Sequence, residues 1–169
     1  MQVSVKGADR KLGNLLRKAC KFYGNELMHG NLSKHVSIKI LHHNKSKEYP
    51  DKGSCIWDDG WNSKKPREFL ITIARGQSKI DKLHTLAHEM VHVKQYAKGE
   101  MDGILHKDGF QKWKGAEFKL NPRVNPAKTS GGIMTKKYDY YYLPWEIEAY
   151  GLEVGLTWYF RTQFGIKSR

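Results

Sequence analysis

The chain of 169 residues has little cysteine and no long hydrophobic run, and each absence excludes a class of protein. Its two cysteines, Cys20 and Cys55, lie far apart and form no C-x-x-C pair. We therefore expect two free thiols rather than a disulfide framework or a cysteine-rich zinc site. No apolar stretch is long enough to cross a bilayer, and the first residues do not resemble a signal peptide. These features predict a protein that stays in the cytoplasm.

Acidic residues are also scarce relative to basic ones. Asp and Glu number 17 against 30 Lys and Arg, which gives a net charge of +13 and an isoelectric point near 9.7. Such a charge favours polyanionic partners such as nucleic acid. However, the basic residues are scattered and no nucleic-acid motif gathers them, so a surface that only keeps the protein in solution is an equal alternative. Any nucleic-acid binding should be weak, independent of sequence and lost as salt rises.

One stretch, residues 83–98, carries the strongest chemical signal. It contains HEMVH, a match to H-E-x-x-H, in which a helix presents the two histidines at i and i+4 on one face. This arrangement is typical of catalytic zinc, with His88 and His92 as ligands and Glu89 as the general base. Apolar residues at helical spacing predict a helix that begins near residues 78–81 and ends at Gly99. The alternative is a pair of histidines that bind no metal.

The remaining pattern predicts a small mixed α+β domain. Helical periodicity covers residues 8–28 and the segment from Pro144 to about Phe164, with strands over 35–43, 53–57 and 67–74. One or two short strands are expected between residues 110 and 120. The expected buried stripe of the last helix comprises Trp145, Ala149, Leu152, Leu156 and Tyr159.

These elements predict a zincin-like fold, a single domain over residues 1–169. A small mixed β-sheet from residues 35–74 would pack on the motif helix, and the N- and C-terminal helices would complete the domain. We expect the strand at 67–74 to border the cleft, where its free backbone groups could pair with an extended peptide.

A zinc site needs a third protein ligand, and three residues compete for that role. Glu146 stands in PWEIEAYG at the start of the last helix, and His106 follows the motif helix. Glu148 is the third candidate. It lies about 200° around the helix from Glu146, so the two carboxylates cannot both point at one ion.

Three blocks in order, TLAHEMVHVKQYAKGE, WKG and PWEIEAYG, carry a resemblance to a family of small metallopeptidases encoded by tailed bacteriophages. It covers roughly residues 36–160 and implies a Zn²⁺ cofactor and a peptide or protein substrate in the host cytoplasm. The E-x-E-A block is also similar to the third-ligand segment of gluzincins, which implies Glu146 as the ligand. Gluzincins commonly have Asp or Asn after the small residue to orient a ligand histidine, whereas here Tyr150 stands at that position.

A looser resemblance is to SprT-like metallopeptidases, which are zincins associated with DNA. Their third ligand is a histidine followed by glycine and an aromatic residue, and His106, Gly109 and Phe110 approximate that pattern. The basic composition suits this interpretation. It would make His106 the third zinc ligand in place of Glu146.

The sequence therefore predicts a zinc-dependent metallopeptidase. His88, His92 and Glu146 would hold the metal, Glu89 would act as general base, and Tyr150 is a candidate oxyanion donor or orienting residue. The tyrosines at 140–142 are further oxyanion candidates. The rival is a non-catalytic module, either a phage structural protein associated with the virion or a nucleic-acid-binding protein. In that case zinc would only stabilise the fold, and His106 would occupy the fourth coordination position.

Overall fold

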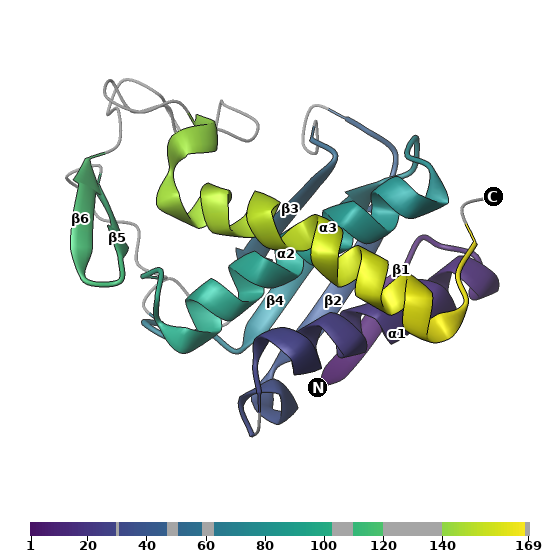
Figure 1. Ribbon diagram of the computed structural model, residues 1–169, viewed down its shortest axis with the longest axis horizontal. Helices are drawn as coiled ribbons and strands as arrows, with labels where there is room; N and C mark the ends of the chain where they lie inside the picture. The colour runs from purple at the N-terminus through teal and green to yellow at the C-terminus, as the bar shows by residue number, and fades with distance from the viewer. Residues whose placement is uncertain (30, 47–50, 59–62, 103–109, 120–139, 168–169) are drawn as a thin grey trace.

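The computed structural model describes residues 1–29, 31–46, 51–58, 63–102, 110–119 and 140–167. They form an α+β structure in which three α-helices lie over one face of a four-stranded sheet, with a separate two-stranded hairpin (Figure 1). The predicted α+β class is confirmed. The strands of the sheet are β1 (Gln2–Lys6), β2 (Ser37–His43), β3 (Gly53–Trp57) and β4 (Glu68–Ala74), and the hairpin consists of β5 (Phe110–Trp113) and β6 (Ala116–Lys119). The helices are α1 (Arg10–Leu27), α2 (Lys79–Lys98) and α3 (Pro144–Phe164), with short 3₁₀ helices η1 (Leu32–His35) and η2 (Tyr140–Tyr142).

The sheet has the order β1-β2-β4-β3, in which β1, β2 and β4 are parallel and β3 is antiparallel. The first strand was not expected from the sequence. Val3 pairs with Ile38 and Val5 with Ile40, so β1 adds to a strand that is itself strongly apolar. Alternation of polar and apolar residues over only five positions predicts a strand weakly. Pairing with β2 stabilises the extended conformation of this segment.

The prediction that β4 offers free backbone groups at the cleft is wrong. β4 pairs with β2 along one side and with β3 along the other, so both rows of its backbone groups are used within the sheet. Among the strands that the structure describes, the edge next to α2 is β3. Any peptide added to the sheet on this side would pair with β3.

Helix α2 lies at the centre of the structure: it packs against β3 and β4 of the sheet and also contacts both α1 and α3 (Figure 1). The Ser78 side chain accepts a hydrogen bond from the Asp81 backbone N–H at 3.1 Å and caps the start. Gly99 ends the helix in the left-handed conformation, with φ of 72°, which favours glycine. The predicted continuous helix is therefore confirmed. Because α2 is covered from several sides, its polar motif residues are buried along with its apolar ones.

The first turn of α3 is held by a small apolar cluster separate from the main core. The cluster consists of Met101, Trp113, Leu143 and Trp145, with Phe118 packed against it. The Trp145 ring lies 5.8 Å from that of Phe118 and 6.3 Å from that of Trp113, measured between centroids. Trp113 and Phe118 of the β5–β6 hairpin thus pack against Trp145, the residue before Glu146.

The predicted buried stripe of α3 is only partly correct. Trp145 and Ala149 are buried, but Leu152 and Tyr159 are 39% and 47% exposed. The face turned toward α2 and α1 instead contains Glu146, Thr157 and Phe160, all buried. The buried face therefore overlaps the predicted stripe but is shifted around the axis, and it includes the polar residues Glu146 and Thr157.

Candidate metal centre

Three buried side chains from two helices converge at the crossing of α2 and α3. The Nε2 atoms of His88 and His92 lie 3.2 Å apart. The Glu146 carboxylate lies 3.3 Å from the first and 3.5 Å from the second. His88 and His92 are one turn apart on α2, and Glu146 reaches them from the first turn of α3. The group could hold a metal ion.

The outer nitrogen of His88, the Nδ1 atom that points away from the converging group, is held by a residue that the sequence analysis did not single out. Its Nδ1 lies 2.9 Å from a carboxylate oxygen of Glu153, which projects from α3. A carboxylate only accepts, so this nitrogen carries the proton and donates. Metal-binding histidines commonly donate their second N–H to such a carboxylate, which sets the ring orientation and tautomer. Glu153 thus sets the orientation and tautomer of the His88 ring.

The outer nitrogen of His92 is held differently. Its Nδ1 lies 2.8 Å from the side-chain oxygen of Gln95, in the next turn of α2. The orientation of this amide follows from its other end, since the Gln95 Nε2 donates to the backbone oxygen of Trp145 and to Glu148, both at 2.9 Å. Both partners are acceptors, so the oxygen of the amide faces His92 and the Nδ1 of His92 must donate.

Both outer nitrogens are therefore protonated, and in the neutral rings both inner Nε2 atoms present lone pairs to each other and to the Glu146 carboxylate. Three electron-rich groups facing one another inside the protein repel unless a positive charge lies among them. Either a proton on one ring or a metal cation would relieve that repulsion. The donor set of two imidazole nitrogens and one carboxylate fits a divalent transition metal.

The two histidines differ in their affinity for that proton. Burial opposes a charge on His88, but the carboxylates of Glu146 and Glu153 outweigh it and raise the pKa of His88 to about 10. For His92, burial dominates and lowers the pKa, because its outer partner is a neutral amide. A proton in the metal-free centre therefore belongs on His88.

Glu89 lies beside the three converging groups and is itself 6% exposed. Burial raises the pKa of Glu89 to about 8, with the charge of His88 opposing this and that of Glu146 adding to it. Strand β3 comes close at this point, since a Cβ added to Gly53 would lie 3.0 Å from a Glu89 carboxylate oxygen and 2.3 Å from a methyl carbon of Thr85. Glycine is therefore required for β3 to approach α2 here.

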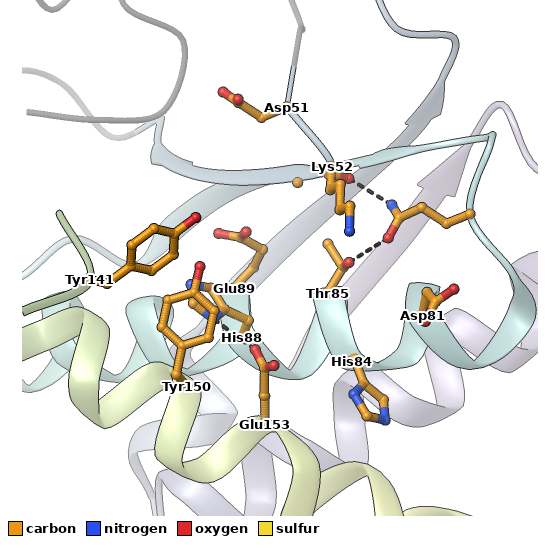
Figure 2. A pocket seen from close by; sticks show the side chains of 12 residues that line it. Asp51, Lys52, Asp81, His84, Thr85, His88, Glu89, Tyr141, Tyr150 and Glu153 are labelled. Atoms are coloured by element: carbon orange, nitrogen blue, oxygen red, sulfur yellow. Dashed lines mark hydrogen bonds and ion pairs between the residues drawn. The ribbon is translucent and has the colours of Figure 1, made fainter.

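A cavity of about 560 Å³ opens next to Glu89 and extends along the N-terminal half of α2. Figure 2 shows Tyr141 and Tyr150 on one side of Glu89, with Lys52 and Thr85 on the other. His88 and Glu153 also line this cavity, so the converging groups border the open space. The arrangement gives a small molecule or an extended chain access to one side of the centre.

The other candidates from the sequence lie elsewhere or outside the described residues. The Glu148 carboxylate points to Lys94 and Gln95, at 2.9 Å from each, and is not part of the converging group. His106 and the side chain of Tyr140 lie outside the described residues, and Tyr142 is 68% exposed and not among the residues that line the cavity. The sequence reasoning missed Glu153 and Gln95. Helical spacing could have found both, because Glu153 follows Glu146 by two turns and Gln95 follows His92 by about one.

Comparison with known proteins does not place the chain in a family: no family model matches it, and no curated protein or solved structure is significantly similar to it. Among the described residues, no helix combines the length and apolar character that a bilayer-spanning helix needs. Conclusions about function therefore depend on the geometry and chemistry of the centre itself.

Proposed function

We propose that the protein is a zinc-dependent peptidase whose metal is held by His88, His92 and Glu146. The observation that carries this proposal is the spacing of the donor atoms: the two Nε2 atoms lie 3.2 Å apart, and Glu146 approaches His88 with one carboxylate oxygen at 3.3 Å and His92 with the other at 3.5 Å. Zinc takes nitrogen and oxygen ligands at about 2.0–2.2 Å in tetrahedral geometry, which sets ligand atoms roughly 3.3–3.5 Å apart. The observed spacings are close to these values, so the three side chains are already gathered at the separation that a zinc ion requires.

A bound zinc ion would supply Lewis acidity, which acidifies a coordinated water and polarises the carbonyl of a peptide bond. The protein's part is to leave room for that water and substrate, and the cavity next to His88 and Glu89 provides it. Three protein ligands with an open fourth position are the pattern of catalytic rather than structural zinc. Among the described residues, three side chains converge and a cavity lies beside them, which supports an enzyme over a protein in which zinc is only structural.

Glu89 is the general base in this proposal. Its carboxylate borders the cavity next to the two histidines, and its pKa of about 8 lies near neutral pH. A group with such a pKa can both take and release a proton efficiently. Glu89 would accept the proton of the attacking water and then donate it to the leaving amine.

Strand β3 is the proposed binding site for the substrate backbone. It is the edge strand of the described sheet, and its first residue, Gly53, lines the cavity. An extended peptide can add to a sheet edge through main-chain hydrogen bonds. A peptide lying along β3 would pass over Glu89, where the scissile bond is required.

Tyr150 is the preferred donor to the developing oxyanion, with Tyr141 second. The Tyr150 ring lies 4.6 Å from that of His88, and the Tyr141 ring lies 5.6 Å from that of Tyr150. Burial and the charge of Glu146 raise the pKa of Tyr150 to about 12, so its hydroxyl keeps its proton at neutral pH. A protonated hydroxyl beside the zinc ligands can donate to an oxyanion.

The test uses fluorescein-labelled casein and the zinc-loaded protein. We expect hydrolysis that 1,10-phenanthroline abolishes and added zinc restores. Glu89→Gln should keep zinc bound but reduce turnover by about 10²–10⁴-fold, the range for loss of a general base. Glu117→Gln is the matched control, because Glu117 lies on the exposed hairpin. Full hydrolysis by Glu89→Gln would exclude this mechanism.

Cobalt substitution distinguishes a catalytic metal site from the alternative in which the metal is only structural. In the enzyme, added azide should change the visible spectrum of the Co²⁺ protein, because a coordination position is exchangeable. In a closed site, with His106 as an additional ligand, azide should have no effect. A spectrum insensitive to azide in wild type but sensitive in His106→Ala would assign the structural role.

A further inference from the structure

We propose that Gln95 is a positioning residue that couples the two helices of the centre. Its single side-chain amide holds the outer nitrogen of His92 and the start of α3, next to Glu146. The inference rests on the proposed metal centre, but not on peptide hydrolysis.

The amide is fully buried, with 0% of Gln95 exposed, and it makes three hydrogen bonds. Its oxygen accepts from the Nδ1 of His92 at 2.8 Å, and its nitrogen donates to the Trp145 backbone oxygen and to Glu148 at 2.9 Å each. Trp145 immediately precedes Glu146. One planar group therefore contacts the ring of one proposed ligand and the backbone beside another.

Only an amide meets these requirements together. The His92 side needs an acceptor, so that Nδ1 carries the proton and Nε2 is left as a ligand. The α3 side needs two donors, one for a backbone carbonyl and one for a carboxylate. A glutamate at position 95 would accept from His92 but could not donate, and an aliphatic side chain would do neither.

The far side of the amide is anchored by an ion-pair network, which prevents the amide from flipping. Glu148, which accepts from Gln95, is also paired with Lys94 at 2.9 Å and with Lys114 at 3.6 Å. Lys94 in turn pairs with Glu100 at 2.6 Å. Lys94 and Gln95 are adjacent on α2, so this network ties the end of α2 to α3. Glu148, a ligand candidate from sequence, acts here as the anchor of Gln95.

The experiment compares Gln95→Leu, Gln95→Glu and a matched control, Gln111→Leu. Gln111 is also buried and also donates to backbone carbonyls, those of Asp102 and Lys112, but it does not touch the proposed ligands. Zinc affinity is measured by competition with a chromophoric chelator, and thermal unfolding of the metal-free variants is followed by circular dichroism. The tautomer of His92 is read from ¹⁵N NMR of the metal-free protein.

We expect Gln95→Leu to bind zinc about 10–100-fold more weakly than wild type, the usual effect of losing a partner of a metal ligand. Gln95→Glu should lose less zinc affinity than Gln95→Leu, because it keeps the hydrogen-bond acceptor for His92. Gln111→Leu should keep the wild-type affinity even if it melts at a lower temperature, which separates positioning from stability. In metal-free wild type, the His92 proton should be on Nδ1, and in Gln95→Leu it should be shared between the two ring nitrogens.

Equal zinc affinities for Gln95→Leu and Gln111→Leu would overturn the role of Gln95, as would a wild-type His92 protonated on Nε2. Intact zinc binding without casein hydrolysis would reject the peptidase proposal and leave the Gln95 result standing. A wild-type protein with no measurable zinc affinity would overturn both.

Discussion

His88 and His92 are one helical turn apart on α2 and equally buried, yet they behave as different chemical groups. Each is 8% exposed, and each turns its Nε2 toward Glu146. His88 is held from outside by a carboxylate of α3, and its pKa is raised to about 10. His92 is held by a neutral amide of its own helix, and its pKa is lowered.

The difference shows that the outer partners, rather than the motif, decide how each histidine holds a proton. The repeat at i and i+4 makes the two rings equivalent in position. The carboxylate behind His88 favours a positive charge there, whereas the amide behind His92 orients the ring without adding charge. In the metal-free protein a proton on His88 therefore takes the place of a cation, and a metal ion would have to displace that proton in order to bind.

The largest expected effect comes from removing either ring. His88→Ala and His92→Ala should each weaken zinc binding by more than about 100-fold, above the range for loss of an outer partner. His84→Ala is the control, because His84 lies on the same helix and lines the cavity but is outside the converging group. Isothermal titration with zinc measures the affinities. Retention of wild-type affinity by either alanine variant would show that the ring is not a ligand.

A smaller effect on zinc affinity is expected from Glu153→Gln. This change replaces the carboxylate that contacts Nδ1 of His88 with a neutral amide, like the one that contacts Nδ1 of His92. In wild type, zinc affinity should rise by about tenfold per pH unit from pH 7 toward 10, because one proton must leave His88. The variant lowers the pKa of His88, so this slope should flatten. At pH 10 the variant should bind about 10–100-fold more weakly than wild type.

The measurement for Glu153→Gln is chelator competition across the pH range, with Glu117→Gln as a control at an exposed carboxylate. The control should keep the wild-type slope. An unchanged slope in Glu153→Gln would mean that Glu153 does not control the proton of His88.

The smallest effect is on the stability of the metal-free protein. His88 has a pKa raised to about 10, so its contribution is fully present below its ordinary value of 6.5 and is lost as pH rises toward 10. The pKa of Glu89 is raised from 4.5 to about 8, so its contribution to stability is likewise lost as the pH rises, between about 4.5 and 8. The lowered pKa of His92 acts oppositely, but only below about pH 6.5, where the unfolded chain takes up its proton.

We therefore expect the melting temperature of the metal-free protein to fall between pH 6.5 and pH 9, by at least about 2–4 °C, the shift that 1 kcal/mol produces in a chain of this size. Saturating zinc should reverse the trend, since the metal replaces the proton. Differential scanning calorimetry with and without zinc measures both. A metal-free protein that gained stability over this range would contradict the assignment of the proton to His88.

The sequence by itself determined the features that depend on near neighbours along the chain. Ser78 and Gly99 mark the two ends of α2, and the apolar spacing between them requires a helix, so the shared face of His88 and His92 followed directly. The start of α3 was equally local, because Pro144 is favoured at the first helical position. Glu146 was singled out through a resemblance, and the structure brings it to the histidines.

Only the tertiary structure decided which residues complete the centre. Apart from the resemblance, no residue pattern favoured Glu146 over Glu148, because that choice depends on how α3 rotates as it packs on α2. It could not assign the cleft edge to β3 instead of β4, because strand order is a long-range property. The opposite pKa shifts of His88 and His92 also arise from non-local contacts, since burial and the carboxylates that raise one of them come from packing α3 against α2.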